Sequence, residues 1–226
     1  MVRAAAFPER RVGVEFLTEG GTETEVLYKW GFELPQFAMF PLLDNPEAVA
    51  AMKGMFRRYL DVVARHGMAA LLSGLDYRAS PDWGALLGYS RDSLADANRQ
   101  AIRLLKELAR EYAADIAEIR IGGIVGPRGD AYSLNRTITA EEAEDYHAVQ
   151  LETLKSAEVD IAGAMTFNNT AEAIGVARAA ARIGVPLSIS LTVHGAARLK
   201  SGPSVAEAIA TIDAATDASP AFYMLN

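Results

Sequence analysis

The sequence predicts an α/β protein that is built around a parallel sheet. Six short apolar segments alternate with helical segments in units of roughly 25–45 residues, and this alternation is typical of parallel βα architectures. The third apolar segment runs into a glycine-rich loop that contains Gly122, Gly123, Gly126 and Gly129. Because ligands of parallel α/β proteins bind where the carboxyl ends of the strands meet, we expect this loop to border a binding site.

Each strand is expected where apolar residues alternate with polar ones or run together between turn signals. The predicted strands cover 14–18, 68–73, 116–121, 159–165, 185–193 and 220–225. We expect their loops to reach one common rim.

The helices are predicted from their start and stop signals. Asn45 is expected to be an N-cap, Thr139 and Ser204 each open a capping box, and Gly67 and Gly184 are expected to end helices. The helix over 90–112 is the clearest, because apolar residues recur there at spacings of three and four. The predicted helices cover 24–30, 45–66, 90–112, 139–157, 169–183 and 204–215, with a further helical turn inside a long loop at 74–88.

Two architectures fit this order: an open doubly wound sheet, or a (β/α)8 barrel that lacks its last two units. The last strand, 220–225, carries only its leading Pro220 to protect it as a sheet edge. We therefore predict a (β/α)8 TIM-barrel type with about six βα units present. No linker or change in composition divides the chain, so we expect a single domain over 1–226 that is incomplete at its carboxyl end.

Composition excludes several classes of function. The net charge is −7 and no basic stripe is present, which argues against nucleic-acid partners. No apolar run approaches the length of a membrane span, and no signal peptide is recognisable, so we expect a soluble cytoplasmic protein. The sequence contains no cysteine, which excludes disulfides, zinc–thiolate sites and a thiol nucleophile within these residues.

The strongest candidate for binding is the segment Glu19-Gly20-Gly21-Thr22 after the first strand. A carboxylate there could hold an ammonium group, and paired glycines bring backbone amides close to a ligand. The alternative is a tight strand-to-helix turn with a solvated glutamate.

Three other loops offer weaker signals. The loop with Asp76, Tyr77 and Arg78, and with Asp82 and Trp83 further on, suits a substrate wall or simply an ion pair with a packed tryptophan. The loop from Gly126 to Asp130 could bind an anion through its amides and Arg128, or could be a proline–glycine turn. After the fourth strand, Thr166, Asn168 and Asn169 offer neutral polar contacts, with Asn169 expected as a helix N-cap and Met165 as core.

The histidines do not have the spacing of a metal triad. His66 and His147 are expected at the surface, and His194 is the one histidine placed near the rim.

Several segments together resemble the homocysteine S-methyltransferase family. Residues 17–25, LTEGGTETE, are similar to the family's opening motif L-x-D-G-G-x-x-T-E-L, and residues 123–132, GIVGPRGDAY, to its G-S-x-G-P-x-G. Shorter matches in the same order lie at 159–166, 188–190, 199–202 and 222–226.

The resemblance implies a barrel that transfers a methyl group to the thiol of homocysteine or a related thiol, as in methionine biosynthesis. It implies zinc held by three cysteine thiolates, which would bind the acceptor as a thiolate. The first expected ligand would follow Asn226, so we expect a truncated chain that cannot bind zinc in the family manner and is inactive. Two departures from the family are Glu19 for aspartate and Met165 for glutamate.

For this chain the resemblance implies substrate-binding residues but no catalytic or metal-binding residue. Glu19, with the amides of Gly20 and Gly21, would orient an amino-acid substrate beside Thr22. Thr166 would add a hydrogen bond and Asn226 would flank the site. Gly126 and Pro127 would shape the pocket floor.

The expected partners are a small thiol and a methyl donor, together with self-association into a homo-oligomer. Two alternatives stay open: a non-catalytic barrel remnant that self-associates, and a metal-independent barrel enzyme that uses Glu19 or His194 as general base.

Overall fold

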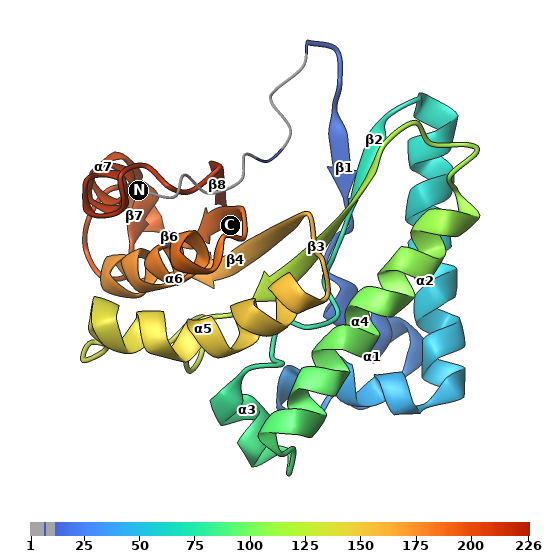
Figure 1. Cartoon of the computed structure of the whole chain (residues 1–226), viewed down its shortest axis with the longest axis horizontal. Helices are drawn as coiled ribbons and strands as arrows, with labels where there is room; N and C mark the ends of the chain where they lie inside the picture. The colour runs from blue at the N-terminus through green and yellow to red at the C-terminus, as the bar shows by residue number, and fades with distance from the viewer. Residues whose placement is uncertain (1–6, 8–11) are drawn as a thin grey trace.

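Six parallel strands form the main sheet of the computed structural model, which describes residues 7 and 12–226 (Figure 1). The strands are β1 (Phe16–Thr18), β2 (Ala69–Leu72), β3 (Ile119–Val125), β4 (Ile161–Phe167), β5 (Leu187–Leu191) and β8 (Phe222–Leu225). They lie side by side in this order, and each neighbouring pair is parallel. A doubly wound sheet would reverse its strand order at a switch point. The sequential order and the curled sheet confirm the barrel-type fold, present here as a half-barrel.

Helices cover the outer face of the curled sheet (Figure 1). The helices on this face include α2 (Pro46–His66), α4 (Arg91–Glu111), α5 (Ala140–Ser156) and α6 (Thr170–Ile183). Two shorter helices, α1 (Thr22–Trp30) and α3 (Pro81–Leu86), lie beyond the ends of the strands. The remaining elements are α7 (Val205–Thr216) and the 3-10 turns η1 (Pro35–Phe37), η2 (Phe40–Asp44) and η3 (Gly195–Ala197). Two short antiparallel strands, β6 (Val193–His194) and β7 (Arg198–Leu199), lie between β5 and α7. Along the described chain no helix has the length and apolar character that crossing a membrane requires.

Local capping explains where the longer helices begin and end. Asn45 accepts hydrogen bonds from the amides of Glu47 (3.0 Å) and Ala48 (3.3 Å) at the start of α2. The capping boxes predicted at Thr139 and Ser204 are both present. The glycines that end α2 and α6 have left-handed φ values of 62° and 77°, a conformation that glycine adopts without strain. These starts and stops confirm the sequence prediction.

Strand β3 continues further than predicted, through Gly122 and Gly123 to Val125. The two glycines serve packing, not a turn. A Cβ atom on Gly123 would lie 2.5 Å from Cδ2 of Leu154 in α5, and one on Gly122 would lie 3.2 Å from Cβ of Ser73. The loop therefore begins only at Gly126.

Alternate residues of the strands face opposite sides of the sheet. On the outer side, large side chains from strands and helices form the hydrophobic core, among them Phe56, Leu105 and Phe167. The concave side carries both large and small residues, and the small ones include Gly122, Gly163 and Ser188. The small side chains leave room for a cavity on this side.

Phe7 bridges the first and last strands of the sheet. Its ring centroid lies 5.9 Å from that of Phe16 in β1 and 5.7 Å from that of Phe222 in β8. Both partners stand at the amino ends of their strands, so Phe7 packs at the end of the half-barrel opposite the predicted binding rim.

Candidate functional site

A cavity of about 560 Å³ opens at the carboxyl ends of the strands. Its wall includes side chains or backbone from β2, β3, β4 and β8, together with the β1–α1 corner. The structure brings six of the predicted site residues into this wall: Glu19, Gly20, Gly21, Thr22, Thr166 and Asn226. Gly126, Pro127 and His194 lie outside the wall, and His194 is exposed on β6.

Glu19 reaches across from β1 to the end of β2. One carboxylate oxygen, Oε2, accepts a hydrogen bond from the amide of Ser73 (3.2 Å), and the other accepts one from the Ser73 hydroxyl. Burial raises the pKa of Glu19, and the bonds from Ser73 lower it in part. Both oxygens of Glu19 are therefore engaged by the protein itself.

Glu23 is a second carboxylate in the wall, one turn further along in α1. Its Oε2 accepts a hydrogen bond from the Thr22 hydroxyl at 3.3 Å. Burial raises the pKa of Glu23, and the nearby charge of Arg78 lowers it. The N-cap of α1, Gly21, supplies no side-chain cap, so the positive end of this helix opens toward the cavity.

Arg78 is a buried cation in the same wall. Its Nη1 donates to the carbonyl oxygen of Gly129 (2.9 Å), and its guanidinium stacks 4.0 Å from the centroid of the Trp83 ring. The ion pair between Nη2 and Asp130 is long, at 3.9 Å. Arg78 therefore ties the β3 loop to the β2 loop while it lends positive charge to the cavity.

Tyr77 and Thr166 form one side of the cavity. Their hydroxyl oxygens lie 2.6 Å apart, and Thr166 has a left-handed φ of 62°, which is strained for a β-branched residue. Gly126 lies behind Tyr77 and donates its amide to the Tyr77 carbonyl (3.1 Å). A Cβ on Gly126 would come within 2.8 Å of that carbonyl oxygen, so only glycine fits.

Asp76 is sealed beneath this wall and has no exposed surface. Its Oδ1 accepts from the Ile124 amide (2.9 Å), whereas Oδ2 has no partner in the described part of the chain. Burial raises the pKa of Asp76 to about 7.

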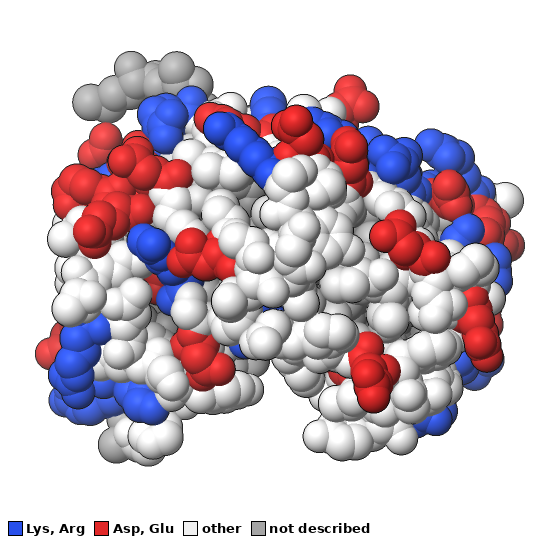
Figure 2. All heavy atoms as spheres, turned by 90° about the horizontal axis from the view of Figure 1, so that it is seen from below, with Lys and Arg blue, Asp and Glu red and all other residues white. Residues whose placement is uncertain are grey.

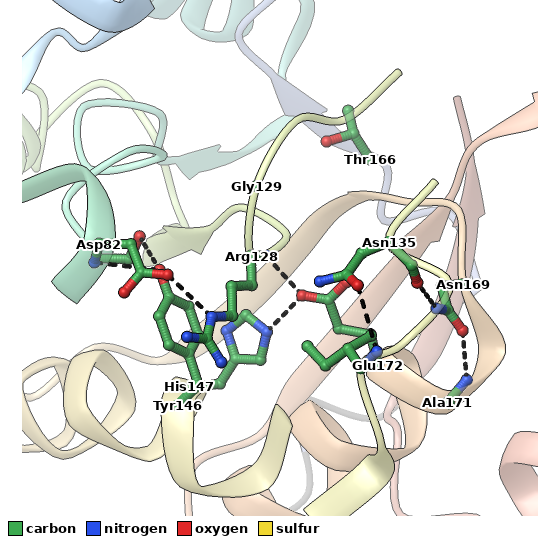
Figure 3. A network of polar contacts seen from close by, with 12 residues as sticks. Asp82, Arg128, Gly129, Asn135, Tyr146, His147, Thr166, Asn169, Ala171 and Glu172 are labelled. Carbon is green, nitrogen blue, oxygen red and sulfur yellow. Dashed lines mark hydrogen bonds and ion pairs between the residues drawn. The ribbon is translucent and has the colours of Figure 1, made fainter. Parts of the chain in front are cut away.

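A buried polar network holds the β3 loop from outside the cavity (Figure 3). Oε1 of Glu172 accepts from the Arg128 amide (2.5 Å) and contacts Nε2 of His147 at 3.0 Å. His147 is buried, which corrects the expectation of a surface residue, because this side of α5 faces α6 and β4. Asn168 and Asn169 bind backbone carbonyls further along the loop.

The Arg128 side chain points away from the cavity. Its Nε donates to Asp82 of α3 (2.9 Å), and the guanidinium lies 4.8 Å from the centroid of the Tyr146 ring (Figure 3). The hypothesis of an anion site around Arg128 is therefore wrong for this side chain. Asp82 pairs with a residue of a distant loop, not with a near neighbour.

Sequence reasoning missed Ser73 and Glu23 as members of the site. Ser73 carried no signal, because its role depends on the neighbouring strand. Glu23 did carry a signal in the sequence, because it stands four residues after Glu19, on the helix that follows the Gly-Gly pair.

The comparisons with known proteins agree with the fold. The model of the family "Homocysteine S-methyltransferase" matches residues 16–226. No curated protein matches the chain. The metallated crystal form of the homocysteine methyltransferase MmuM from Escherichia coli is 20% identical, with a TM-score of 0.75, over 94% of this chain and 74% of that one. The oxidized form is 20% identical, with a TM-score of 0.76, over 94% of this chain and 73% of that one. The apo form is 19% identical, with a TM-score of 0.67, over 98% of this chain and 74% of that one.

Proposed function

The chain belongs to the homocysteine S-methyltransferase family, and from this premise we propose that its cavity binds homocysteine or a related amino-acid thiol as a methyl acceptor. The acidic corner of the cavity is the observation that carries the proposal. Two carboxylates, the open start of α1 and buried Arg78 meet there. This arrangement suits a small ligand that carries both an ammonium and a carboxylate group.

Each of the predicted site residues would either contact the ligand or support the cavity wall. The corner formed by Glu19, Gly20, Gly21 and Thr22 would receive the amino-acid end of the ligand. The Thr166 hydroxyl, held by Tyr77, would offer a hydrogen bond. Asn226 would bound the site beside β8, and Gly126 with Pro127 would support the wall from behind.

Zinc bound by thiolates does not fit the residues of this chain. The sequence has no cysteine, and the described residues hold no group of three or more His, Cys, Asp or Glu side chains placed for a metal ion. The proposed role of these 226 residues is ligand binding, and we expect the chain alone to be inactive in methyl transfer.

Two measurements test the proposal separately. An NMR titration with L-homocysteine should shift resonances of residues in the cavity wall, and a chain that shows no such shifts would refute the ligand class. Methyl transfer to homocysteine should be absent, and zinc should stay far below one ion per chain. Stoichiometric zinc together with methyl transfer would show that the proposed inactivity is wrong.

A further inference from the structure

Asp76, Glu19 and Glu23, three of the acidic side chains in or beneath the cavity wall, differ in how far the protein already uses them. Asp76 is sealed, and both oxygens of Glu19 accept hydrogen bonds from Ser73. Glu23 is held only locally, by the hydroxyl of Thr22 and its own backbone amide. Within the described residues it makes no hydrogen bond or ion pair to another element. Glu23 therefore keeps more free acceptor capacity for a bound cation than Glu19, which already accepts two hydrogen bonds from Ser73.

The charges of the wall also favour a cation at this point. Glu19, Glu23 and Asp130 contribute three carboxylates, and Arg78 is the one Lys or Arg side chain that lines the described wall. Burial raises the pKa of both glutamates and so disfavours their charge, and the charge of Glu23 raises the pKa of Glu19 further. A ligand cation would relieve this cost.

The positions of Glu23 and Arg78 indicate how an amino-acid ligand would be oriented in the cavity. Arg78 is close enough for its charge to act on Glu23. Its contact with half-exposed Asp130 is long, and its Nε is buried without a partner in the described part of the chain. An amino-acid headgroup that places its ammonium at Glu23 would have its carboxylate near Arg78 and the first amides of α1.

We propose that Glu23, and not Glu19, forms the ion pair with the ammonium group of the amino-acid ligand. Glu19 is then a positioning residue, which fixes the corner by joining β1 to Ser73. This inference rests on the proposed function, but it assigns the recognition to a different residue.

The test compares two ligands that differ only in the ammonium group. They are L-homocysteine and its α-hydroxy analogue, 2-hydroxy-4-mercaptobutanoate, titrated by NMR into the intact chain and its variants. Glu23→Gln should weaken homocysteine binding about 10-fold or more, as expected for a lost charged hydrogen bond, and should leave the analogue unchanged. Glu19→Gln should affect both ligands alike. Glu33→Gln removes an exposed acid outside the wall and should change neither.

Thermal unfolding supplies a second readout. Because Glu23 is partly buried as a charge, Glu23→Gln should raise the melting temperature at neutral pH, whereas loss of a merely structural residue would lower it. The inference is overturned if Glu23→Gln leaves the preference for homocysteine intact, or if Glu19→Gln alone abolishes it. Failure of the unaltered chain to bind either ligand would overturn the proposed function itself, and this inference with it.

Discussion

Asp76 shows how one buried side chain couples the stability of the rim to pH. Its carboxyl ties the β2 loop to β3 through the Ile124 amide, and its pKa rises from the ordinary 3.8 to about 7. Between these values the folded protein holds a proton that the unfolded chain has released. This contribution to the free energy of unfolding therefore falls as the pH rises from about 4 to 7, and then levels off.

Asp76→Asn should remove this part of the pH dependence, because asparagine keeps the acceptor for Ile124 without a titrating group. Urea unfolding at about pH 5 and about pH 8 would measure it. We expect the variant to lose less stability than the original chain between the two conditions. Asp115→Asn, at an exposed position, should behave like the original chain. Equal losses in all three proteins would contradict the assignment.

Gly126 offers a test of close packing behind the cavity. Gly126→Ala would place a Cβ 2.8 Å from a backbone oxygen that cannot move freely, and should cost about 1–3 kcal/mol of stability. Gly54→Ala is the matched control, since nothing lies within 4 Å of that position in α2, and it should stabilise by about 0.5–1 kcal/mol. Chemical denaturation of both variants would measure these changes in stability. A change of the same sign in both would contradict the close packing assigned to Gly126.

At the scale of single residues, the sequence predicted which residues meet at the rim of the sheet. It predicted less well which contacts each of these residues makes. Six predicted residues line the cavity because strand ends converge in any parallel half-barrel. The sequence could not predict which way the Arg128 and His147 side chains point, because their partners, Asp82 and Glu172, come from distant helices.

At the scale of whole elements, helix α5 holds several residues of the rim in place. Along its buried side, Tyr146 binds Ser80, His147 binds Glu172, and Gln150 donates to the carbonyls of Asp76 and Ile124. A helix in this layer normally presents apolar side chains to the sheet. Here polar side chains share the buried side with Leu151 and Leu154, and Gln150 binds backbone carbonyls of the β2 loop and of β3.

Gln150→Ala should therefore be costly, since it leaves several buried acceptors without a donor. We expect a loss of about 2–3 kcal/mol in the free energy of unfolding. Glu152→Ala, at an exposed position two residues along α5, should change stability by less than about 0.5 kcal/mol. Similar losses in both variants would mean that the cost comes from the helix and not from the buried contacts.

Elements were predictable where their signals are local. Caps at Asn45, Thr139 and Ser204 involve residues two or three apart, and these helices begin where predicted. The end of β3 was missed because Gly122 and Gly123 look like a loop in sequence. Their purpose, the approach of α5 and of Ser73, is visible only in three dimensions.

For the whole molecule, the sheet order leaves β1 and β8 as its edges among the described strands. Strand β8 carries no charged residue, and Leu225 is 63% exposed. Uncharged edges of this kind pair readily with another chain. We therefore expect self-association, the oligomer that the sequence analysis anticipated.

Leu225→Lys should weaken that association by placing a charge on the edge. Light scattering coupled to size-exclusion chromatography would show a dimer or larger species for the original chain and a shift toward monomer for the variant. Leu86→Lys, at an exposed residue of α3 away from the edge, should leave the size unchanged. A monomeric original chain would refute the prediction.

The contact of Phe7 with Phe16 and Phe222 bears on how the chain acquires its structure. Neighbouring βα units can pair soon after each forms, because their contacts are close in sequence. The Phe7–Phe222 contact joins the two ends of the chain and must wait until the whole sheet is in place. Packing of Phe7 should therefore be a late step of folding, and mutations at Phe7 should speed unfolding while leaving the folding rate nearly unchanged.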